Sequence, residues 1–67
     1  MKEEFKNLRE EIKSTTNKRT LIFHKRRANN IKDEYSNSNY SAKTRKSVNR
    51  EYSKTLKEIH KKDKQLS

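Results

Sequence analysis

The sequence contains no glycine, no proline, no cysteine and no tryptophan. Glycine and proline form tight β-turns at the lowest conformational cost, and an all-β fold of this length would need several such turns. Without cysteine the chain has no disulfide, no thiolate zinc site and no cysteine nucleophile. These absences favour α-helices held together by side-chain packing alone.

Apolar residues are also scarce, at 25% of the 67 residues against roughly 45–50% in an average globular domain. The longest uninterrupted apolar run is Leu21-Ile22-Phe23, whereas a membrane span needs about 20 residues and the core of a signal peptide about 7. We therefore expect one small unit over 1–67, with no membrane span and no classical secretion signal. The expected location is the cytoplasm, in association with the nucleoid or with a larger assembly.

Strong helix formers fill most of the chain, and Ser, Thr and Asn cluster at 14–17 and 36–41. These clusters predict the joints of an all-α, three-helix assembly with helices at about 2–13, 18–35 and 42–64. Asn17 and Ser41 are placed to cap the second and third helices. From Ile12 to Leu21 the helical phase changes by about 180°, so the chain either turns at 14–17 or continues as one helix in a bent two-helix assembly. The turn is favoured.

Each predicted helix carries one apolar stripe at spacings of three and four residues. The first stripe is Phe5, Leu8 and Ile12; the second is Leu21, His24, Ala28, Ile31 and Tyr35; the third is Val48, Tyr52, Leu56, Ile59 and Leu66. So few apolar side chains predict a thin core that a partner protein or a homodimer completes. The residues expected at that interface are Leu21, Ile31, Tyr35, Val48, Tyr52, Leu56 and Ile59.

The net charge of +10 is distributed unevenly along the chain. Residues 1–17 are neutral overall, residues 18–35 carry +4 and residues 36–67 carry +6. In the third helix the basic residues recur every three or four positions and form one stripe, which consists of Lys43, Lys46, Arg50, Lys54, Lys57, Lys61 and Lys64. The stripe lies about 200° from Val48 and extends for roughly 32 Å, close to one turn of B-DNA. This pattern predicts phosphate contacts with a nucleic acid.

A second group of basic residues in the predicted second helix consists of Arg19, Lys25, Arg26 and Arg27. Arginine can bind phosphate or guanine through two parallel hydrogen bonds, so Arg26 and Arg27 are the candidates for a contact to a base edge. Tyr40 lies outside the apolar stripes and is the tyrosine placed to stack on an unpaired base. The alternatives for all these charges are a solvated basic surface, or contact with another polyanion such as an acidic protein or an anionic membrane surface.

No pattern in the sequence points to catalysis, a metal or a cofactor. His24 and His60 are 36 residues apart, and His24 lies within an apolar stripe, where a partly buried structural role is expected. The adjacent acidic pairs point about 100° apart on a helix and do not converge. We therefore expect a protein that is not an enzyme, with no small-molecule substrate.

The function that these patterns favour is nucleic-acid binding, to DNA or RNA, through phosphates and with modest sequence preference. One alternative is an interaction module or inhibitor of phage or plasmid type that docks an amphipathic helix on another protein. A further alternative is a structural component of a ribonucleoprotein or virion, ordered only on assembly.

Overall fold

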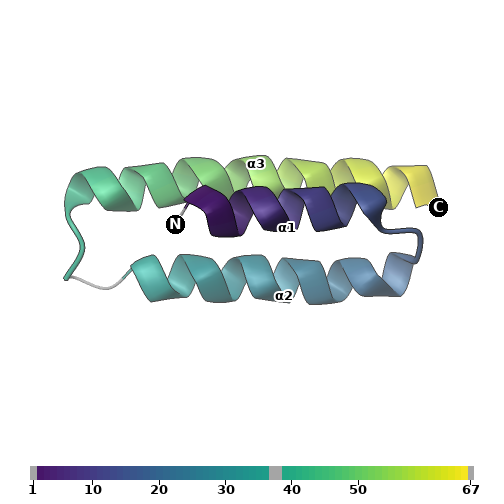
Figure 1. Ribbon diagram of the computed structural model, residues 1–67, viewed down its shortest axis with the longest axis horizontal. Helices are drawn as coiled ribbons and strands as arrows, with labels where there is room; N and C mark the ends of the chain where they lie inside the picture. The colour runs from purple at the N-terminus through teal and green to yellow at the C-terminus, as the bar shows by residue number, and fades with distance from the viewer. Residues whose placement is uncertain (1, 37–38, 67) are drawn as a thin grey trace.

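The computed structural model describes residues 2–36 and 39–66, which form three α-helices: α1 (Lys2–Ser14), α2 (Lys18–Tyr35) and α3 (Ala42–Leu66). Those residues contain no strand. The helices lie side by side and alternate in direction, in a bundle measuring 39 × 16 × 15 Å (Figure 1). The prediction of an all-α, three-helix fold is confirmed, with helix ends within two residues of those expected.

The first joint is a turn over 15–17, so the alternative of one continuous helix is wrong. Asn17 has extended backbone angles, and its side chain accepts a hydrogen bond from the Arg19 backbone N–H at 2.9 Å, as expected of an N-cap. On the other side of the joint, the hydroxyls of Ser14 and Thr15 donate hydrogen bonds to the Glu11 carbonyl oxygen in the last turn of α1. This carbonyl group therefore has hydrogen-bond partners at the helix end. Short polar side chains thus reverse the chain without glycine.

At the second joint, residues 37 and 38 lie outside the described part of the chain. Ser36 caps the end of α2, and its hydroxyl donates to the Lys32 carbonyl oxygen at 2.9 Å. Ser41 is an N-cap of α3, as predicted, since its hydroxyl accepts from the Thr44 backbone N–H at 3.2 Å. Tyr40 lies beside Tyr35, with ring centroids 5.1 Å apart, and it remains exposed, at 39%.

The core combines one face of each helix. Three fully buried side chains of α1, Phe5, Leu8 and Ile12, pack against the buried faces of α2 and α3. The remaining buried apolar side chains are Leu21, Ala28, Ile31, Val48 and Ile59. The α1 helix is the shortest of the three, and it ends beside the start of α2, so that the first turns of α3 extend beyond it (Figure 1). None of the described helices has the length and apolar content needed to cross a bilayer.

Four of the seven residues expected at a partner interface are buried within the chain. Leu21, Ile31, Val48 and Ile59 are at most 9% exposed and belong to the core of the chain itself. The apolar spacing of a helix does not indicate whether another helix of the same chain or a partner covers it, and in this fold the three helices cover one another's stripes. Tyr35, Tyr52 and Leu56 pack at the edge of this core and are partly buried.

Polar groups join α1 to α3 at the level of Glu51. Arg9 Nη2 lies 3.0 Å from Glu51 Oε1, and Arg9 Nη1 lies 3.5 Å from the Thr55 hydroxyl oxygen. Burial raises the pKa of the Glu51 carboxyl, but the hydrogen bond and charge of Arg9, with the charge of Lys54, outweigh it and hold the pKa below its usual value. Within the described residues no buried side-chain nitrogen or oxygen lacks a hydrogen-bond partner.

Candidate nucleic-acid interface

The basic stripe of α3 lies on the solvent side of the helix along its whole length. All seven of its residues are exposed: Lys43, Lys46, Arg50, Lys54, Lys57, Lys61 and Lys64. The core side of the same helix is occupied by Val48, Thr55 and Ile59. Because α3 is one continuous helix of 25 residues, the stripe is a single row of cations held by one rigid element.

Few acidic groups neutralise this row. Lys54 Nζ lies 3.5 Å from Glu51 Oε2, but its side chain is 57% exposed and Glu51 is already paired with Arg9. Among residues 2–36 and 39–66, no ion pair engages Lys43, Lys46, Arg50, Lys57 or Lys61. Most of the positive charge on the stripe is therefore available to a polyanion.

The basic side chains of α2 do not all point the same way. Arg19, Lys25, Arg26 and Arg27 are all exposed. However, Arg27 Nη1 forms an ion pair with Glu11 Oε2 on α1 at 3.0 Å, so its guanidinium is directed towards α1. Lys25 lies at a cleft beside Leu56 and His60 of α3, on the other side of α2. Of the two arginines proposed for base contacts, Arg26 is the one without an ion pair among the described residues.

The start of α2 and the end of α3 lie side by side at one end of the bundle. Lys18 Nζ lies 3.5 Å from Asp63 Oδ1, which places the first turn of α2 beside the last turns of α3. Figure 1 shows the start of α2 and the end of α3 at the same end of the molecule. Lys25, which lines a cleft with His60, is therefore near the Lys61 end of the stripe, whereas Lys43 and Lys46 lie near the start of α3.

The buried Arg9 to Glu51 pair is a feature that the sequence analysis missed. Its signal was present, because Val48, Glu51, Thr55 and Ile59 follow the spacing of one helical face. A charged residue on such a face gives no sign by itself that it is buried, because its partner, Arg9, lies on another helix.

The two histidines lie in different surroundings. His24 Nε2 lies 2.8 Å from the Thr15 hydroxyl oxygen, and its side chain is 12% exposed, which supports the predicted structural role. His60 is exposed on α3. In the described part of the chain, no three His, Asp or Glu side chains gather in a way that could hold a metal ion.

No protein-family model matches the sequence, and comparisons with curated proteins and with solved structures give no significant match.

Proposed function

We propose that this protein binds nucleic acid along the outer face of α3, mainly through phosphate groups. The observation that supports this most strongly is that all seven residues of the basic stripe are exposed on one side of a single helix, opposite the core. A duplex presents phosphates as a dense linear array, and the stripe is of similar length to one B-DNA turn, at roughly 32 Å. Because lysine contacts phosphate as a point charge, the sequence preference is modest.

The proposal predicts a strong dependence of affinity on salt. Five to seven phosphate contacts correspond to a slope of roughly −4 to −6 for log affinity against log salt concentration. The measurement is fluorescence anisotropy of a labelled duplex of about 30 base pairs, as DNA and as RNA, at several salt concentrations. No binding to either duplex near about 50 mM salt would refute the proposal.

A matched pair of variants separates the stripe from net charge. Lys46→Glu on the stripe and Lys6→Glu on α1 change the net charge equally, and both positions are exposed. Lys46→Glu should reduce the magnitude of the salt slope by about 1 or more, whereas Lys6→Glu should leave the slope as it is. If both variants weaken binding equally, the interaction depends on net charge and the assignment to α3 is wrong.

A further inference from the structure

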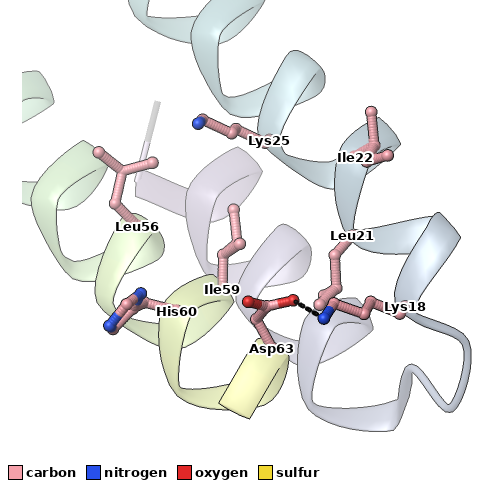
Figure 2. Close-up of a pocket in the computed structure, with 8 residues that line it drawn as sticks. All are labelled: Lys18, Leu21, Ile22, Lys25, Leu56, Ile59, His60 and Asp63. Carbon is pink, nitrogen blue, oxygen red and sulfur yellow. Dashed lines mark ion pairs between the residues drawn. The ribbon is translucent and has the colours of Figure 1, made fainter. Parts of the chain in front are cut away.

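A cleft lies between α2 and α3 on a side of the pair that α1 does not cover. It encloses about 480 Å³, and its apolar lining is Leu21, Ile22, Leu56 and Ile59 (Figure 2). Leu21 and Ile59 belong to the core, but Ile22 is 63% exposed and Leu56 is only partly buried. The cleft therefore extends the core to the surface and leaves aliphatic area in water.

Cations surround this apolar lining. Lys25 of α2 lines one side, and a second hollow adjoins it at Leu56 and His60 and is otherwise lined by Lys57, Lys61 and Lys64. The acidic group at the cleft, Asp63, is already paired with Lys18 at 3.5 Å (Figure 2). The aliphatic strip thus lies between Lys25 on one helix and lysines on the other.

We propose that this cleft binds an acidic amphipathic helix from another protein. The groove between two antiparallel helices is where a further helix packs in a four-helix bundle, and amphipathic helices commonly bind in such grooves. Aliphatic side chains of the bound helix would cover Ile22 and Leu56, and its Asp or Glu residues would flank them and face Lys25 and Lys57.

Two other occupants fit the cleft less well. A nucleic acid could contact the lysines, but its phosphate backbone offers no aliphatic surface to cover Ile22 and Leu56. A second copy of the chain would bring a net charge of +10 towards a basic rim. An acidic helix satisfies both the apolar lining and the charge of the rim.

This site is separate from the proposed nucleic-acid contact but adjoins it. Lys57 and Lys61 belong both to the α3 stripe and to the surroundings of the cleft. A bound acidic helix would therefore compete with phosphates for the Lys61 end of the stripe and leave the Lys43 end accessible.

The test uses the intact protein and a synthetic helical peptide of about 18 residues, with Leu at spacings of three and four and Glu at the flanking positions. One control peptide has the same composition with its leucines distributed around the helix, and a second has Lys in place of Glu. Binding is measured by fluorescence anisotropy of the labelled peptide near physiological salt. The first peptide should bind in the micromolar range, and both controls should bind at least about tenfold more weakly.

Adjacent positions on α2 provide a matched pair of variants, because Ile22 and Phe23 are 63% and 64% exposed and only Ile22 lines the cleft. Ile22→Ser should weaken peptide binding by about tenfold, whereas Phe23→Ser should not change it. Circular dichroism checks that both variants keep the helical content of the parent. Equal affinities of the two variants for the peptide, or equal binding of the peptide with dispersed leucines, would overturn the proposal.

Duplex binding by the same variants distinguishes this proposal from the proposed function. Lys46→Glu should weaken duplex binding and leave peptide binding intact, and Ile22→Ser should do the reverse. If Ile22→Ser weakens duplex binding and not peptide binding, the cleft is part of the nucleic-acid surface and the peptide proposal is wrong.

Discussion

The contact between Arg9 and Glu51 is the clearest place to test how this small core is held together. Arg9 Nη2 and Glu51 Oε1 are 3.0 Å apart, and the two side chains are 19% and 10% exposed. Removing one member of a largely buried ion pair leaves the other without its partner, which costs about 3–5 kcal/mol at a fully buried site. The partial exposure of both side chains reduces the expected cost here.

The two single substitutions should lower the free energy of unfolding by different amounts. Arg9→Met leaves the Glu51 carboxylate with Lys54 alone, at 3.5 Å and 57% exposed, so we expect a loss of about 2–3 kcal/mol in the free energy of unfolding. Glu51→Leu leaves Arg9, whose long side chain can reach water, so we expect a loss of about 1–2 kcal/mol. Replacing both places apolar side chains between α1 and α3, and the double variant should be within about 1 kcal/mol of the parent.

The assay is urea unfolding of all four proteins, followed by circular dichroism at about 10 °C, where small domains are near maximum stability. A chain of this length has a total stability of roughly 3–10 kcal/mol, so each single variant should show a clear fall in its unfolding midpoint. The decisive quantity is the coupling energy between the two positions. If the losses of the single variants add up in the double variant, the cost does not come from an unpaired charge and the reasoning is refuted.

Two further predictions concern the first joint and the dependence of stability on pH. Asn17→Ala should lower the free energy of unfolding by about 1 kcal/mol, because α2 loses its N-cap, while Thr16→Ala, at an exposed position one residue before the cap, should have a smaller effect in the same urea assay. Because the fold lowers the pKa of Glu51, its carboxylate stabilises the protein above the unfolded value of about 4.3, and this contribution is lost as the pH falls through the folded value. The difference in stability between the parent and Glu51→Gln should therefore shrink from pH 7 to about pH 3, and a constant difference would contradict this assignment.

The helices and their ends could be predicted from the sequence because the signals are local. Asn17 and Ser41 cap helices through contacts with residues two or three positions away, and such contacts depend on short stretches of chain. The apolar spacing of Phe5, Leu8 and Ile12 likewise predicts which face of α1 is buried, whatever covers it. The exposure of the α3 stripe follows from the same periodicity, since Lys46 and Arg50 lie opposite Val48 on one helix.

What covers each face was decided only by the tertiary structure. The pairing of stripes determines that Val48 and Ile59 are core residues of this chain, and no local signal contains that information. Arg9 pairs with Glu51 from 42 residues away, and Arg27 pairs with Glu11 on another helix. The cleft beside Ile22 has the same origin, because it is lined by residues of α2 and α3 alone and α1 packs on another side of this pair. Local spacing determined which side chains share a helical face, and the packing of three helices determined which faces meet and which remain in water.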